Sequence, residues 1–212
     1  AKGYFLCSFP GRAGDLLWAL PTVRAIAEAT GAPVDLQICG EFAEMVPLLE
    51  AQPYLSGIQA DPTWPMSAGW QPSVNKGPYD KVYHLGYRRW PELPLPFEVD
   101  QTVRVDIELP PLDLDRPWMT IPDPQSRVFA LGWSDCWFEL KLGVTELVLA
   151  RLRAEFQSRV LVPPGSRWTT EPSRRYEGGG EAAVDKYAAV QPTGWVEAAQ
   201  YLAGCSVFFG DC

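Results

Sequence analysis

The sequence has few of the residues that most often build metal centres and disulfide frameworks. Among 212 residues it contains one histidine, His84, and five cysteines with no Cys-x-x-Cys pair. Zinc sites and disulfide frameworks usually depend on clustered or regularly spaced cysteines and histidines. We therefore expect no disulfide framework, no metal site and no cofactor, and a protein of the reducing cytoplasm. His84 is predicted to be a half-buried strand residue rather than a catalytic base.

Long apolar runs and an excess of positive charge are also missing. No segment approaches the roughly 20 apolar residues that cross a bilayer, and 18 Lys+Arg stand against 26 Asp+Glu. We therefore expect no transmembrane segment, and no nucleic acid partner, because phosphate backbones are bound by basic surfaces. The 47% hydrophobic content is ample for a buried core, so a folded globular chain is expected.

Strand and helix patterns alternate along the chain, separated by proline and glycine. Short apolar runs predict strands, and apolar spacings of three and four predict amphipathic helices. The first series comprises strands at 4–9, 34–39, 57–60 and 81–85 and helices at 16–29 and 42–49. After a proline-rich stretch the pattern restarts, with strands at 128–133, 160–162 and 207–209 and helices at 145–156 and 195–203. Such alternation indicates right-handed βαβ units and parallel sheets.

This organisation predicts an α/β fold with two Rossmann-like, doubly wound parallel-sheet domains. Residues 1–108 would form the N-terminal domain, residues 109–125 a proline-rich connector, and residues 126–212 a partial C-terminal domain. The second series stops at the turn after its last strand, before a helix that a covered parallel sheet would need. We therefore expect the full protein to continue beyond Cys212.

The strongest local feature is the loop Gly11-Arg12-Ala13-Gly14-Asp15 between the first strand and the first helix. Open α/β folds bind ligands at the carboxyl ends of their strands, where this loop would lie. Asp15 could therefore face a ligand, or it could serve only as a helix N-cap, which contributes roughly 1 kcal/mol. A dinucleotide fingerprint fails because Leu17 occupies the place of the third glycine, and a Walker loop fails because no GKS or GKT follows.

Two long segments resemble a known family. GDLLWALPTVRAIAEATGAPVDLQIC, followed by AEMVPLLEAQPYLSGI, resembles the opening of glycosyltransferase family 9, the heptosyltransferase-like enzymes of bacterial surface-polysaccharide assembly. VFALGWSDCWFELKLG and TGWVEAAQYLAGCSVFFGDC are similar to later parts of the same family. The resemblance implies a GT-B fold, in which the N-terminal domain takes the acceptor and the C-terminal domain takes the nucleotide-diphosphate sugar donor.

The implied reaction is sugar transfer, with inversion and without a metal, to a glycan or lipid-linked saccharide acceptor such as a lipopolysaccharide core. Peripheral membrane association through such an acceptor is compatible with this assignment. The resemblance makes Asp15 the general base on the acceptor hydroxyl, with Gly11, Arg12 and Gly14 in the acceptor-side loop. A carboxylate within hydrogen-bond reach can accept the hydroxyl proton as the new bond forms.

The resemblance also implies a donor site in the second domain. A lysine and backbone amides can stabilise a departing nucleoside diphosphate without magnesium, and the matching positions are Gly132, Ser134, Lys141, Gly210 and Asp211. Lys141 could instead be a solvated surface residue, and Asp211 could merely cap the next helix. Gly210-Asp211-Cys212 departs from the family's Asn-Asp turn, and the helix that would hold the pyrophosphate is absent from this chain. The competing function is a non-catalytic nucleotide- or carbohydrate-binding or interaction module with the same fold.

Overall fold

The computed structural model of the protein describes residues 3–64, 77–86, 92–122, 129–132, 158–161, 193–203 and 208–209. The chain forms two compact units, Ala1–Thr120 and Ile121–Cys212. Each unit is described by itself below. No helix in the described part of the chain is both long enough and apolar enough to span a bilayer.

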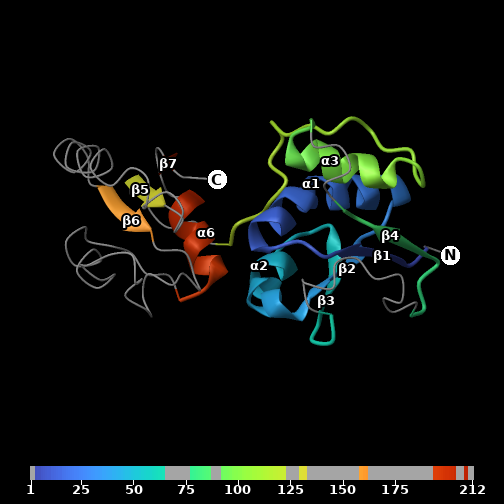
Figure 1. Ribbon diagram of the computed structural model, residues 1–212, viewed down its shortest axis with the longest axis horizontal. Helices are drawn as coiled ribbons and strands as arrows, with labels where there is room; N and C mark the ends of the chain where they lie inside the picture. Colours follow the sequence, from blue (N-terminus) through green and yellow to red (C-terminus); the bar gives the residue numbers. More distant parts are fainter. Residues whose placement is uncertain are drawn as a thin grey trace. The chain divides into compact units, whose positions relative to one another are not determined.

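The first unit is built on a parallel four-stranded sheet (Figure 1). Its strands are β1 (Phe5–Phe9), β2 (Val34–Cys39), β3 (Leu55–Asp61) and β4 (Lys81–His84), in the order β3-β2-β1-β4. All six residues of β2 are buried, as expected of a strand covered on both faces. The sheet confirms the predicted α/β class and is consistent with a Rossmann-like fold.

Helix α1 (Ala13–Thr30) carries the chain from β1 to β2. It begins three residues before the predicted start because Ala13 and Gly14 precede the first apolar residue of the periodic pattern. Pro21 lies inside the helix and is buried, although it removes one backbone donor. The helix ends at Gly31, whose φ of 71° is the left-handed conformation that glycine adopts without steric cost.

Two helical segments of the first unit differ from the prediction. Where one interrupted helix was predicted at 42–49, a 3-10 helix η1 (Gly40–Met45) leads into α2 (Val46–Glu50), and Pro47 lies in the first turn of α2. Helix α3 (Leu95–Val103) was not predicted, and it has Pro94 at its N-cap and Pro96 in its first turn. A proline in the first turn costs no helical hydrogen bond. Helix α3 packs against α1, as seen in Figure 1.

The stretch predicted to be a connector is tied to the first unit over much of its length. The side-chain amide of Gln52 pairs with both backbone groups of Thr120, donating to its carbonyl at 2.9 Å and accepting from its amide at 2.7 Å. The Tyr54 hydroxyl donates to the Trp118 carbonyl at 2.7 Å, and Arg24 Nη1 donates to the Pro117 carbonyl at 2.6 Å. Residues 117–120 therefore have defined backbone partners although they form no regular element.

A carboxylate organises the amino-terminal edge of the sheet. Asp35 is 5% exposed, and its two oxygens accept hydrogen bonds from the hydroxyls of Tyr4 at 3.0 Å, Tyr79 at 2.7 Å and Ser56 at 2.7 Å. The rings of Tyr4 and Tyr79 stack with centroids 4.9 Å apart. The bond to Asp35 raises the pKa of the Tyr4 hydroxyl. This cluster lies at the edge opposite to the one where open α/β folds bind ligands.

The second unit contains another parallel sheet. Its strands are β5 (Phe129–Gly132), β6 (Ser158–Leu161) and β7 (Phe208–Phe209), in the order β6-β5-β7. Helix α6 (Trp195–Ala203) has the predicted bounds, and Thr193 places its amide at 2.7 Å and its hydroxyl at 2.9 Å from Glu197 Oε2 in the first turn. The helix predicted at 145–156 lies outside the described residues.

Candidate functional site

The carboxyl end of β1 and the loop that follows it form the most tightly specified part of the candidate site. A Cβ atom on Gly11 would lie 2.2 Å from Phe9 Cε1 and 2.9 Å from Asp15 Cβ. Phe9 is completely buried, so its ring cannot move aside without disturbing the core. Glycine at position 11 is therefore required for the close approach of the loop, the buried ring and the helix. A Cβ on Gly14, in contrast, would meet no described atom within 4 Å apart from its chain neighbours and the backbone of its own helix.

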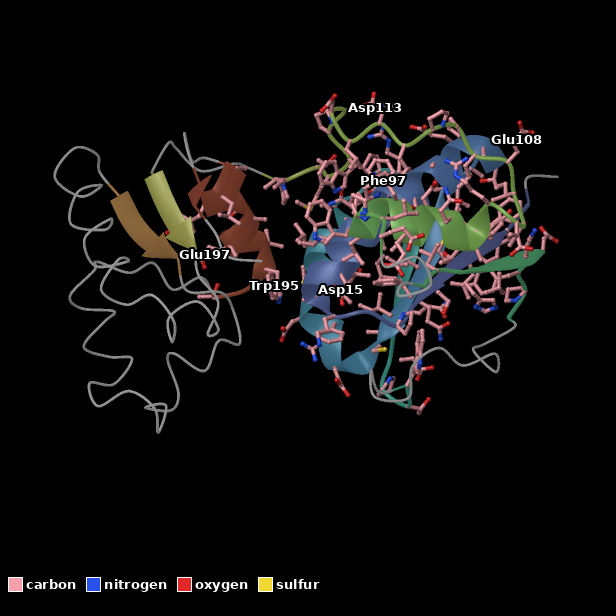
Figure 2. All side chains as sticks on the ribbon, turned by 45° about the horizontal axis from the view of Figure 1, so that its top comes forward. Asp15, Phe97, Glu108, Asp113, Trp195 and Glu197 are labelled. Carbon is pink, nitrogen blue, oxygen red and sulfur yellow. The ribbon has the colours of Figure 1, made fainter. Side chains whose placement is uncertain are left out.

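Asp15 lies in the first turn of α1, immediately beyond this loop (Figure 2). It is not the N-cap, which is Arg12, but the third helical residue, and its Oδ2 accepts a 3.3 Å hydrogen bond from the Arg12 backbone amide. The Leu16 amide donates to the Arg12 carbonyl at 2.7 Å and closes the same turn. The carboxylate is partly exposed, and no bond to its Oδ1 is found within the described residues. Asp15 thus stabilises the first turn of the helix through one carboxylate oxygen, and its other oxygen is available to accept a proton from a ligand.

Arg12, Gly14 and Asp15 reach the surface together. Arg12 and Gly14 are exposed, whereas Gly11 is buried beneath them. The structure therefore divides the predicted acceptor-side loop into a structural residue, Gly11, and residues that a ligand can approach. Helix N-terminal amides favour negative charge at this position.

A polar row crosses the sheet close to the same edge, and it was not identified from the sequence. Ser8 of β1 is in register with Gln37 of β2 and with His84 of β4, and Gln37 is in register with Gln59 of β3. Ser8 Oγ and Gln37 Oε1 are buried and have no hydrogen-bond partner among the residues that the structure describes. Only strand register could have revealed this row, because the four residues are far apart in the sequence.

Two ionisable groups lie at the polar row: Asp61, which is next to it, and His84, which is part of it. The Asp61 carboxylate accepts from the Thr63 hydroxyl at 2.7 Å and the Thr63 amide at 2.8 Å, and these bonds lower its pKa. His84 is partly buried, as predicted, and loss of solvent lowers its pKa below 6.5. The imidazole is therefore held mainly in its neutral form at neutral pH.

The two cysteine thiols of the first unit lie in the core. Cys7 and Cys39 are free and buried. Burial raises the pKa of both thiols, that of Cys39 to about 11, so neither is a thiolate at neutral pH. Within the described ranges no group of three or more His, Cys, Asp or Glu side chains could hold a metal ion.

The predicted donor residues are described only in part. Gly132 is the last residue of β5, at the carboxyl end of the central strand of the second sheet. Ser134, Lys141, Gly210 and Asp211 lie outside the described residues. Their assignment to a donor site stays a prediction.

Comparison with known proteins places this geometry within a class of folds. No protein-family model and no curated protein sequence matches the chain. Two solved structures that do resemble it are of bacterial glycosyltransferases, and their similarity extends over 99% of this chain with a TM-score of 0.57 and 16% sequence identity. At this identity the similarity demonstrates a shared fold.

Both structures are of the bacterial protein TibC. One is described as the iron-containing dodecameric glycosyltransferase TibC of enterotoxigenic E. coli, and the other as the dodecameric iron-containing heptosyltransferase TibC in complex with ADP-D-β-D-heptose. The present chain spans 53% of the length of TibC in each comparison. The shared fold therefore corresponds to about half of the length of TibC.

Proposed function

We propose that this chain is part of a glycosyltransferase that moves a sugar from a nucleotide-diphosphate donor to a glycan or lipid-linked saccharide acceptor. The first unit would bind the acceptor and the second would contribute to the donor site, in a GT-B arrangement. Inversion at the sugar carbon and independence from metal follow from the family 9 resemblance of the first sixty residues. The ADP-heptose complex of TibC supports a nucleotide-sugar donor as the ligand class.

The observation that carries the proposal is the placement of Asp15. Its carboxylate lies at the carboxyl edge of a parallel sheet, in the first turn of α1, and is partly exposed. One oxygen is oriented by the Arg12 amide. An attacking hydroxyl becomes acidic as it bonds to the anomeric carbon, and Asp15 would take that proton while developing charge on the leaving diphosphate is stabilised elsewhere.

The donor is identified first, with the full-length protein. Thermal-shift measurements against ADP-, GDP-, UDP- and CDP-linked sugars, each with EDTA and with magnesium, should show stabilisation by one nucleotide that EDTA does not remove. Stabilisation that requires an added divalent ion would contradict metal independence. Transfer is then assayed with the selected donor, and the anomeric configuration of the product, read by NMR, tests inversion.

The role of Asp15 is tested with an isosteric pair of variants. Asp15→Asn preserves the side-chain shape but removes the basic carboxylate, so kcat should fall by about 10²–10⁴-fold with a small change in KM. Asp115→Asn makes the same chemical change at an exposed connector residue and should leave kcat unaltered. Full activity of a correctly folded Asp15→Asn enzyme would refute the assignment. Nucleotide-sugar binding without turnover in the parent protein would instead favour the non-catalytic binding module.

A further inference from the structure

An exposed tryptophan lies on the same helix as Asp15. Trp18 of α1 is 41% exposed, although tryptophan is usually well buried. Trp118 from the connector stacks against its indole, with ring centroids 6.1 Å apart and an angle of 29° between the ring planes. The two residues are distant in sequence, so this contact is created by the course of the connector over α1.

The backbone around Trp118 is anchored on both sides. Its own carbonyl accepts a hydrogen bond from the Tyr54 hydroxyl, and the preceding Pro117 carbonyl accepts one from Arg24. Thr120 is hydrogen-bonded to the side chain of Gln52. Gln52 is 1% exposed, so this anchor belongs to the core of the first unit. Trp118 is thereby held against Trp18 before any ligand arrives, which lowers the entropy cost of binding to the exposed ring.

Helix geometry brings Trp18 close to the proposed base. Residues three apart on a helix are neighbours on its surface, so Asp15 and Trp18 lie on one face. Helical side chains also lean toward the N-terminus and cover the preceding turn, which here contains Gly14. Gly14 is exposed, and a Cβ there would meet no described atom within 4 Å apart from its chain neighbours and the backbone of its own helix, so a ligand can approach the first turn beside Trp18.

We infer that Trp18 is the stacking platform for a pyranose ring of the acceptor, and that Trp118 is the positioning residue that holds it. This inference rests on the proposed transferase function. The C–H face of a pyranose is apolar and packs on the electron-rich face of an indole, while its hydroxyls point outward at the ring edge. A ring stacked on Trp18 would direct edge hydroxyls toward Asp15 and the exposed Arg12.

The subsite can be tested by binding, without donor or turnover. Saturation-transfer NMR on the full-length protein would use methyl α-D-mannopyranoside and methyl β-D-galactopyranoside as probes, with sorbitol as an acyclic polyol control. At least one glycoside should receive saturation at its ring protons, whereas sorbitol should not. Failure of both glycosides to bind, or equal saturation of sorbitol, would overturn the inference.

Variants locate the binding on the indole. Trp18→Ala should weaken glycoside binding about tenfold, and Trp18→Phe should retain it within about threefold, since a smaller aromatic face remains. Trp118→Ala should weaken binding less than Trp18→Ala does, and Trp118→Phe should restore it. Unchanged binding by a folded Trp18→Ala protein would assign the aromatic pair to a protein contact or to packing and overturn the proposal.

The outcome is separable from that of the proposed function. Asp15→Asn should lower the kcat of transfer by about 10²–10⁴-fold but leave glycoside binding within about twofold, because stacking does not use the carboxylate as a base. If no donor supports transfer and the glycosides still bind through Trp18, the transferase proposal fails while the saccharide subsite stands. If transfer proceeds but Trp18→Ala leaves the acceptor KM unchanged, the subsite fails while the function stands.

Discussion

The same substitution, glycine to alanine, should have opposite effects at two positions of the acceptor-side loop. At Gly11 the new methyl group would lie 2.2 Å from Phe9 Cε1, 2.5 Å from Phe9 Cζ and 2.9 Å from Asp15 Cβ. Overpacking a rigid core costs about 1–3 kcal/mol, and two severe contacts with a fully buried ring favour the upper half of that range. At Gly14 the methyl group would clash with no described residue, so the higher helix propensity of alanine should stabilise the protein by about 0.5–1 kcal/mol.

Urea denaturation followed by circular dichroism measures both effects. With a slope near 2 kcal/mol per molar, Gly11→Ala should lower the midpoint by about 1 M, and Gly14→Ala should raise it by a few tenths of a molar. Gly11→Ala should also reduce transfer, because Asp15 must shift, whereas any loss of transfer in Gly14→Ala would report on a ligand approaching the open first turn. A Gly11→Ala protein as stable as the parent, or equal destabilisation by both substitutions, would refute the steric reasoning.

Three further predictions concern the first unit. Asp35→Ala should lower the free energy of unfolding by about 3 kcal/mol, measured by the same denaturation, because three hydroxyl donors lose a buried charged acceptor; stability within 1 kcal/mol of the parent would contradict this. His84 has a lowered folded-state pKa, so the unfolded chain binds more protons below pH 6.5 and the stability from neutral His84 should be lost as pH falls through that range. The denaturation midpoint should therefore drop less between pH 7.5 and 5.5 in His84→Gln, and an identical drop in both proteins would argue against this sign. Gln52→Ala should accelerate amide exchange at Thr120 by about tenfold or more in hydrogen-exchange mass spectrometry, since that amide loses its acceptor; unchanged exchange would show that other contacts hold the connector.

The parallel sheet of the first unit was predictable because its strands are short apolar runs separated by turn residues. Local chemistry identifies such elements without knowledge of the fold. The position of Asp15 at a helix start was predicted for the same reason, because a strand, a glycine-containing loop and a helix start can be recognised from neighbouring residues. Its role as the general base came from the resemblance to glycosyltransferase family 9 and stays a prediction. Helix α3 was missed because Pro94 and Pro96 look like breakers until the first turn is known to contain them.

Features that depend on pairing between distant segments were not predictable. Ser8, Gln37 and His84 form a row only through strand register, and Trp118 reaches Trp18 only because the connector is fixed to Gln52 and Tyr54. Each of these contacts joins segments that are distant in the sequence, and nothing in the local pattern of either segment indicates its partner. The candidate base could therefore be chosen from the sequence, but its aromatic neighbourhood could not.

The anchored connector has a practical consequence for dissecting the protein. A fragment ending at residue 108 would remove the hydrogen-bond partners that the Gln52 and Tyr54 side chains have in the connector, and it would remove Trp118 from beside Trp18. Such a fragment should expose more of the apolar Trp18 indole and lose the hydrogen bonds that stabilise the edge of the first unit. A fragment ending just after Thr120 retains the anchors at Pro117, Trp118 and Thr120 and coincides with the limit of the first compact unit. The proline-rich stretch, which resembles a flexible linker in the sequence, is hydrogen-bonded through Pro117, Trp118 and Thr120 to the rest of the first unit.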